Sequence, residues 1–230
     1  MKTIGVIGGM SWESTAEYYQ EMNRQVKERL GGLHSAECII YSVDFAEIER
    51  YQAEGEWDKA GQVLAEAGKK LELVGADVIV LATNTMHKVI DQIDMATKVP
   101  TIHIADATAD AIKAQGLNRV ALLGTKYTME QEFYKGQIAE QNLDVLVPDE
   151  TDQDHVHHII FDELVLGEFH ENSRQYYIDV INQLVQQGAE GVIFGCTEIG
   201  LLIKSHDVTV PVFDTSQIHV TRAVDYALEN

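Results

Sequence analysis

The sequence predicts an α/β protein made of two pseudo-symmetric halves, each folded around a parallel sheet, with the active site in the cleft between them. Three observations support this prediction. Apolar strand segments alternate with amphipathic helical segments, the second half repeats the first, and short polar motifs follow the strands. In a parallel α/β sheet the ligand site lies at the carboxyl ends of the strands, so these polar motifs are the candidate functional residues.

The first half contains four apolar segments that we expect to be strands. They alternate with segments that we expect to be helices, and the order βαβαβα indicates a parallel sheet. The predicted strands are 3–8, 36–43, 77–81 and 101–105, and the predicted helices are 15–30, 57–74, a helix from about 86 onward, and 107–115.

The second half is expected to repeat this pattern. Its predicted strands are 120–124, 145–147, 191–195 and 210–213, and its predicted helices are 129–141, 173–187 and 216–228. The turn-forming segment Gly116-Leu117-Asn118 lies between the two sets of elements, so we place the boundary there. The predicted domains are residues 1–116 and 117–230, and an exchange of the terminal helices between them is left open.

Three pairs of motifs recur in the same order at nearly constant spacing. Gly8 and Gly124 are 116 residues apart, Thr83 and Cys196 are 113 apart, and Val99-Pro100 precedes Val210-Pro211 by 111. Solenoid repeats have periods of about 20 to 50 residues. The longer spacing here indicates duplication of a whole α/β unit.

Charge and the length of the apolar runs narrow the choice of partners. With 37 acidic against 17 basic residues, the formal net charge of −20 disfavours nucleic acid and anionic membranes. The longest apolar runs, such as 78–82, are too short to cross a bilayer. We therefore expect a cytoplasmic protein with no nucleic-acid or membrane partner.

Cysteine and histidine do not form the pattern of a metal site. The sequence has two cysteines, which predict no disulfide framework, and no Cys/His cluster has the spacing of a zinc site. The run His155, His157 and His158 is interpreted as part of an exposed helix and is given no role. No metal is predicted.

Cys196 is the strongest candidate for chemistry. It follows the apolar run 189–195 and precedes the polar pair Thr197-Glu198, whereas Cys38 lies inside an apolar strand and is expected to act as a small hydrophobic residue. At a junction of strand and helix, the positive end of the helix dipole is expected to lower the pKa of the Cys196 thiol. Cys196 is therefore predicted to be a base or a nucleophile.

The duplication distinguishes between these two roles. A nucleophilic cysteine hydrolase normally needs a histidine partner, and His87, His103 and His219 are candidates by position. Two related halves would instead present two polar turns, at Thr83 and Cys196, from opposite sides. An acid and a base placed in this way suit the inversion of a stereocentre.

The segment Gly8-Gly9-Met10-Ser11 follows the first predicted strand and leads into a helix. No Gly-Lys-Ser/Thr follows, which excludes a P-loop, and the third glycine of the dinucleotide fingerprint is absent. The turn is suited to holding a carboxylate on backbone N–H groups, and Ser14 is expected to cap the helix.

The motifs at the two turns resemble those of the aspartate/glutamate racemase family over essentially the whole chain. Thr83-Asn84-Thr85-Met86-His87 is similar to the family motif Cys-Asn-Thr-x-His, and Gly195-Cys196-Thr197-Glu198 to Gly-Cys-Thr-Glu; the opening IGVIGGMSWEST resembles the aspartate racemase branch. The resemblance implies two pseudo-symmetric α/β halves and a racemase that uses neither pyridoxal phosphate nor another cofactor.

In that family two cysteines flank the α-carbon of the substrate, so the resemblance implies that Cys196 is one of the two catalytic residues. Thr83 occupies the position of the other, and a threonine hydroxyl is a far weaker base than a thiol. The resemblance assigns substrate binding to Met10, Ser11, Gln52, Asn84, Thr85, Thr125, Thr128 and Thr197.

The resemblance also sets expectations about substrate and assembly. Some aspartate racemases place a lysine where this chain has Leu164-Val165-Leu166-Gly167, so aspartate, glutamate or both are the expected substrates. Lys126 or Arg50 could replace that lysine, although both residue types are more often surface charges. A homodimer is expected from the family.

Two alternatives remain open at this point. With one of the two cysteines absent, the chain could be a decarboxylase or isomerase of the same superfamily that uses Cys196 as a proton donor. It could also be a catalytically degenerate protein that binds an acidic amino acid.

Overall fold

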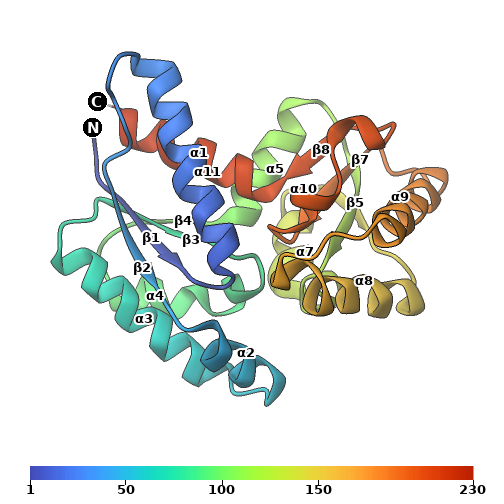
Figure 1. Ribbon diagram of the computed structural model, residues 1–230, viewed down its shortest axis with the longest axis horizontal. Helices are drawn as coiled ribbons and strands as arrows, with labels where there is room; N and C mark the ends of the chain where they lie inside the picture. The colour runs from blue at the N-terminus through green and yellow to red at the C-terminus, as the bar shows by residue number, and fades with distance from the viewer. Residues whose placement is uncertain (230) are drawn as a thin grey trace. The chain divides into compact units, whose positions relative to one another are not determined.

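The computed structural model describes residues 1–229 and consists of two compact units, each with its own four-stranded parallel sheet (Figure 1). The first unit comprises Met1–Ile104 together with the chain from His219 onward, and the second comprises Ala105–Ile218. The predicted α/β class with two parallel sheets is confirmed.

The sheet of the first unit has the strand order β2-β1-β3-β4, and all its pairings are parallel. The strands are β1 (Ile4–Gly8), β2 (Cys38–Ser42), β3 (Val78–Leu81) and β4 (Thr101–Ile102). The helices are α1 (Trp12–Leu30), α2 (Phe45–Ala53), α3 (Trp57–Leu73), the 3-10 helix η1 (Thr85–Val89), α4 (Ile90–Ala96) and the C-terminal α11 (Thr215–Leu228).

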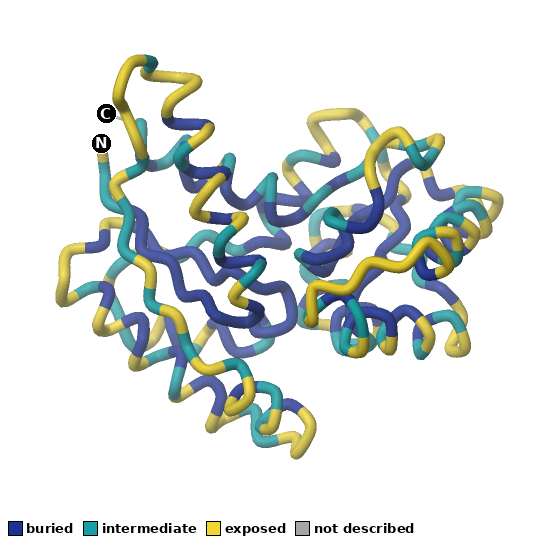
Figure 2. Tube along the Cα trace, viewed as in Figure 1, coloured by how far each residue is buried: buried dark blue, intermediate teal, exposed yellow. Residues whose placement is uncertain are grey.

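Alternate residues of the strands in this unit face different helices. Val6 and Val80 pack with α1 and α11, whereas Ile7, Ile79 and Leu81 pack with α3. This alternation is expected because successive side chains of a strand point to opposite faces. The central strands β1 and β3 are consequently buried along their whole length (Figure 2).

The second unit repeats this topology with the strand order β6-β5-β7-β8. Its strands are β5 (Arg119–Gly124), β6 (Asp144–Leu146), β7 (Gly191–Gly195) and β8 (Val212–Asp214). Its helices are α5 (Ile104–Ala114), α6 (Lys126–Glu130), α7 (Glu132–Glu140), α8 (Glu150–Asp162), η2 (Leu164–Leu166), α9 (Glu171–Gln186), α10 (Ile199–Leu202) and η3 (Ser205–Asp207). Each strand occupies the place of its counterpart four strands earlier, as a duplication would produce.

Several helices differ from the predictions. Residues 129–141 were expected to form one helix, but extended backbone at Gln131 separates α6 from α7. Helix α2 was not predicted, and the helix expected around the histidine run 155–158 had no predicted bounds; it is α8. Helix α8 is rich in acidic and histidine residues, and its apolar side is small because only Val156, Ile159 and Ile160 are buried aliphatic residues. The strand expected at 101–105 has two residues, since α5 begins at Ile104.

The division into units differs from the boundary expected at residue 116. Helix α5 is grouped with the second unit, and α11 from His219 onward is grouped with the first. Each half of the sequence therefore contributes its last helix to the other unit, the arrangement that the sequence left open. Within residues 1–229, no helix combines the length and apolar composition that a membrane crossing requires.

Candidate active site

The motif Thr83-Asn84-Thr85 forms a buried turn between β3 and η1. The three residues are 8%, 3% and 7% exposed, respectively. His87 holds the turn, because its Nδ1–H donates to the Thr83 carbonyl oxygen at 2.8 Å and its Nε2 accepts the Ile104 N–H at 3.2 Å. These bonds fix one neutral tautomer of the ring and tie the turn to Ile104, which also belongs to the first unit.

His219 is held in a similar way inside the first unit. Its Nε2–H donates to the Ile102 carbonyl oxygen at 2.8 Å, and its Nδ1 accepts the Tyr18 hydroxyl at 2.9 Å. Both ring nitrogens of His87 and of His219 are thus committed to hydrogen bonds. Neither ring has a free nitrogen with which to deprotonate a cysteine, which disfavours two of the three histidines considered as partners in a hydrolase.

We expect these buried imidazoles to make the protein sensitive to acid. Burial lowers the pKa of His219 from its ordinary 6.5 to about 4 and, together with His103 and His219, lowers the pKa of His87 well below 6.5. Between pH 6.5 and about 4 the unfolded chain binds more protons at His219 than the folded protein does. Folding stability should therefore fall with pH in this window, by about 3 kcal/mol for His219 alone.

Urea denaturation at neutral pH and within that window measures the effect. The His219→Gln variant, which cannot titrate, should be less stable at neutral pH but should lose less stability on acidification. An identical pH dependence of the two proteins would contradict the assignment of this acid sensitivity to His219.

The turn after β1 is organised by a residue that the sequence analysis missed. The Thr15 hydroxyl accepts the Gly9 N–H at 2.8 Å and donates to the Ser11 carbonyl oxygen at 2.9 Å. Ser11, rather than Ser14 as expected, is the N-cap of α1, since its Oγ accepts the Ser14 N–H at 3.2 Å. The signal was a threonine four residues after Ser11, within reach across the first helical turn.

Gly9 is required in this turn for two reasons. Its φ is +96°, and a Cβ at this position would collide with the Val43 carbonyl oxygen at the end of β2. The glycine therefore lets the Met10-Ser11 turn lie directly against β2.

Gln52 belongs to the same side of the first unit. It is only 6% exposed, so it is not the surface residue that its polarity alone would suggest. Its Nε2 contacts the Met86 sulfur at 3.0 Å, and Met10 and Met86 share one apolar cluster. The structure thus brings Met10, Gln52 and the turn after β3 together.

In the second unit, Cys196 and Thr197 share one acceptor. The Cys196 Sγ–H donates to Glu198 Oε2 at 3.0 Å, and the Thr197 hydroxyl donates to the same oxygen at 2.7 Å. Cys196 is 8% exposed and Glu198 3% exposed. A buried thiol and a buried carboxylate are therefore in direct contact at the end of β7.

The Thr125–Thr128 turn lies beside this pair. Gly124 and Gly195 are register partners in β5 and β7, and a Cβ on Gly195 would lie 3.2 Å from the Thr128 Cγ2. Thr125 is the N-cap of α6, accepting the Thr128 N–H at 3.3 Å, and the two hydroxyls are 3.1 Å apart. Thr128 is fully buried, which favours a positioning role through Thr125.

The expected lowering of the Cys196 pKa was wrong. Burial, the charge of Glu198 and the hydrogen bond to Glu198 raise the pKa of the thiol well above its ordinary value, although the N–H groups of Glu198 and Ile199 act in the opposite direction. The helix that follows, α10, has only four residues, so its dipole is weak. In this state Cys196 is a thiol that donates a proton.

The turns at Thr83 and Cys196 differ in the residue that lies two positions after the reactive side chain. Cys196 has Glu198 there, whereas Thr83 has Thr85, which carries no charge. Within residues 1–229 the Thr83 hydroxyl makes no hydrogen bond to a carboxylate or an imidazole. Among the described residues, a carboxylate hydrogen-bonded to the reactive group is therefore found on the Cys196 side and not on the Thr83 side.

The two basic residues considered as replacements for the missing lysine have carboxylate partners. Lys126 Nζ lies 2.5 Å from Asp154 and 3.7 Å from Glu130, and the Arg50 guanidinium lies 3.6 Å from Glu54. The segment Leu164–Leu166, at which the resemblance places the lysine of some aspartate racemases, forms η2. Both basic side chains are thus paired with carboxylates of the protein, and the structure does not identify either as the ligand of a substrate carboxylate.

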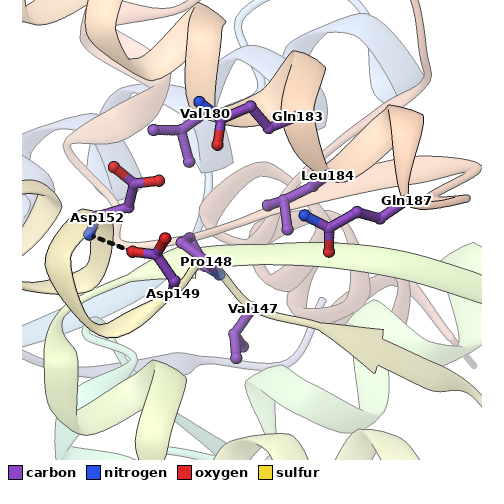
Figure 3. A pocket seen from close by; sticks show the side chains of 8 residues that line it. All are labelled: Val147, Pro148, Asp149, Asp152, Val180, Gln183, Leu184 and Gln187. Atoms are coloured by element: carbon purple, nitrogen blue, oxygen red, sulfur yellow. Dashed lines mark hydrogen bonds between the residues drawn. The ribbon is translucent and has the colours of Figure 1, made fainter.

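A surface cavity of about 210 Å³ lies elsewhere in the second unit (Figure 3). Its walls are the end of β6 with the start of α8 and one side of α9, and it is lined by Val147, Pro148, Asp149, Asp152, Val180, Gln183, Leu184 and Gln187. None of the predicted site residues lines it.

Comparisons with known proteins show which family and which proteins this chain is similar to. The sequence pattern of the Asp/Glu/hydantoin racemase family matches residues 7–223. The broad specificity amino-acid racemase RacX of Bacillus subtilis is 23% identical over 218 residues, which are 93% of this chain and 92% of RacX. A Yersinia pestis protein provisionally named an Asp/Glu racemase is 55% identical with a TM-score of 0.93, and an aspartate racemase homologue from Pyrococcus horikoshii is 38% identical with a TM-score of 0.87. Both structural matches cover 100% of each chain.

Proposed function

Because the chain belongs to the Asp/Glu/hydantoin racemase family, we propose that it racemises aspartate, glutamate or both, without pyridoxal phosphate or a metal. The observation that supports this most is the buried Cys196 thiol in contact with the Glu198 carboxylate. Racemisation requires removal of the α-proton from one face of the substrate and delivery of a proton to the other. A thiol that shares its proton with a carboxylate suits the first of these steps.

In the proposed mechanism the proton of Cys196 moves to Glu198 Oε2, which leaves a thiolate beside a neutral carboxyl group. The thiolate then removes the α-proton of the substrate, which restores the thiol and leaves a carbanion. The Thr83 hydroxyl donates a proton to the opposite face, Glu198 releases its proton to solvent, and solvent returns a proton to Thr83. The net result is an inverted stereocentre and an unchanged enzyme.

This mechanism is asymmetric. Reaction from the Thr83 side requires the hydroxyl to act as a base. Within residues 1–229 this hydroxyl has no hydrogen bond to a carboxylate or an imidazole, since the His87 ring bonds the Thr83 carbonyl oxygen instead. We therefore expect proton removal from the Cys196 side, assigned to the L-enantiomer by resemblance to the family, to be much faster than removal from the Thr83 side.

The substrate-binding residues remain those implied by the resemblance. In the first unit they are Met10, Ser11, Gln52, Asn84 and Thr85, and in the second Thr125, Thr128 and Thr197. Their hydroxyl, amide and backbone donors suit the carboxylates of an acidic amino acid. That both sets act on one substrate, that the protein is a homodimer and that it is cytoplasmic stay predictions.

Chiral chromatography tests the proposal. Each enantiomer of aspartate and glutamate is incubated with the protein, and appearance of the opposite enantiomer supports racemisation. A substituted malonate is tested in parallel, because Thr83 in place of a cysteine favours the one-cysteine decarboxylase as the second candidate. Decarboxylation without racemisation would replace the proposed function, and tight binding of an acidic amino acid without turnover would indicate a binding protein.

The Cys196–Glu198 pair gives a further prediction. In a Cys38→Ser background, where Cys196 is the only thiol, Glu198→Gln should lower the pKa of Cys196, because the charge of Glu198 and its hydrogen bond raise it. Burial should still hold this pKa above its ordinary value. The pH dependence of thiolate absorbance measures the change, and an unchanged or higher pKa in Glu198→Gln would contradict the proposed pair.

A further inference from the structure

We propose that His157, on α8, is a positioning residue for the Thr125–Thr128 turn, which its unprotonated Nδ1 holds by accepting the Lys126 N–H. The inference rests on the proposed function insofar as this turn binds substrate. The hydrogen bond itself, at 3.2 Å, is a property of the second unit. The histidine run on α8 had been given no role from the sequence.

The backbone N–H of Lys126 is a group that needs an acceptor. Lys126 is the first residue of α6, and the first N–H groups of a helix have no partner within it. The side-chain oxygen of the N-cap Thr125 accepts the Thr128 N–H, so the Lys126 N–H needs a different acceptor. A side chain from another helix supplies it, which fixes the turn relative to α8.

The contact has a second component in the ring of His157. This half-buried ring lies edge-on to Tyr127, with centroids 5.8 Å apart, and packs against Phe161 at 4.7 Å. Asp154, one helical turn earlier on α8, pairs with the Lys126 ammonium at 2.5 Å. That ion pair is partly exposed, so it should hold the turn less firmly than the backbone contact does.

The hydrogen bond requires the neutral ring. With Nδ1 as acceptor the proton is on Nε2, and a second proton on Nδ1 would place two donors opposite each other. Burial, His158 and Lys126 lower the pKa of His157, while Asp154 and Asp162 act in the opposite direction. The contact is therefore present at neutral pH and is lost as the pH falls below the ordinary histidine pKa.

Two substitutions distinguish the effect of the hydrogen-bond acceptor from the effect of the bulk of the side chain. His157→Asn keeps an acceptor near the position of Nδ1, whereas His157→Leu keeps bulk but removes the acceptor. His158→Asn is the matched control, because His158 is an exposed neighbour on the same helix that pairs with Asp162. Asp154→Asn removes the ion pair and leaves the backbone contact.

The first readout is the amide NMR signal of Lys126, which does not depend on activity. We expect it to titrate with His157 in the native protein and to exchange faster with solvent in His157→Leu, but not in His157→Asn or His158→Asn. An unchanged Lys126 amide in His157→Leu would overturn the proposal, whatever the protein catalyses. If His157→Leu does not fold, the native protein and His157→Asn still test the proposal. A Lys126 amide that does not titrate with His157 in the native protein, or that exchanges faster in His157→Asn, would then overturn it.

The second readout is the KM of the acidic amino acid. His157→Leu should raise KM about fivefold, the factor expected for one lost hydrogen bond, with little change in kcat. His157→Asn should restore KM, and Asp154→Asn should change it less. A response of the Lys126 amide without a change in KM would overturn the link to substrate binding. Absence of turnover in the native protein would contradict the proposed function and leave the NMR test intact.

Discussion

Replacement of Cys196 by alanine is expected to abolish exchange of the substrate α-proton, with a loss on the order of 10³-fold or more. The structure gives the reason, since Cys196 is the thiol that contacts a buried carboxylate at the end of β7. Alanine removes the sulfur and leaves Glu198 without its thiol partner. Exchange of the α-proton with deuterated solvent measures the effect.

Cys38 provides the matched control. It lies in β2, is half-buried and has a pKa raised by burial alone. Cys38→Ser should therefore leave α-proton exchange unchanged. Loss of exchange in Cys38→Ser, or its survival in a folded Cys196→Ala, would contradict the assignment of the reaction to Cys196.

The second large effect is expected from Thr83→Cys. A thiol ionises far more readily than a hydroxyl, so this variant should supply the base that the Thr83 side lacks. Proton removal from the slower enantiomer should rise by about 10²-fold, the scale of a positioned general base. The rate ratio between the two enantiomers should fall accordingly.

Thr83→Ser serves as the control for this variant, because it keeps a hydroxyl at the same place. It should show no gain for the slower enantiomer. If Thr83→Cys folds but the rate ratio is unchanged, Thr83 does not act on the second face of the substrate, and another residue must do so.

Much of the fold could be predicted from the sequence because the relevant signals are local. Short apolar runs such as 191–195 marked the buried strands, and polar residues directly after them marked Thr83 and Cys196. The bounds of helix α8 were not predicted because its composition is mostly polar and its buried aliphatic residues are few. Periodicity is a weak signal when the buried side of a helix is this narrow.

The chemistry of the site was less predictable because it depends on side-chain contacts. A cysteine at a strand end suggested a lowered pKa, but burial of the sulfur, together with the Glu198 side chain that lies against it, raises the pKa instead. The role of Thr15 and the backbone bonds of His87 likewise depend on the course of the chain in space. Apart from the spacing of four residues between Ser11 and Thr15, no spacing rule in the sequence specifies these contacts.

The most direct test of the proposed mechanism is proton NMR of the native protein with L- and D-aspartate and L- and D-glutamate in deuterated water. The mechanism predicts loss of the α-proton signal with at least one acidic amino acid, accompanied by inversion. It also predicts initial exchange that is much faster for the enantiomer facing Cys196, assigned here to L. Equal rates for both enantiomers would contradict the asymmetry between Cys196 and Thr83. No exchange from any of the four would contradict the proposed racemase.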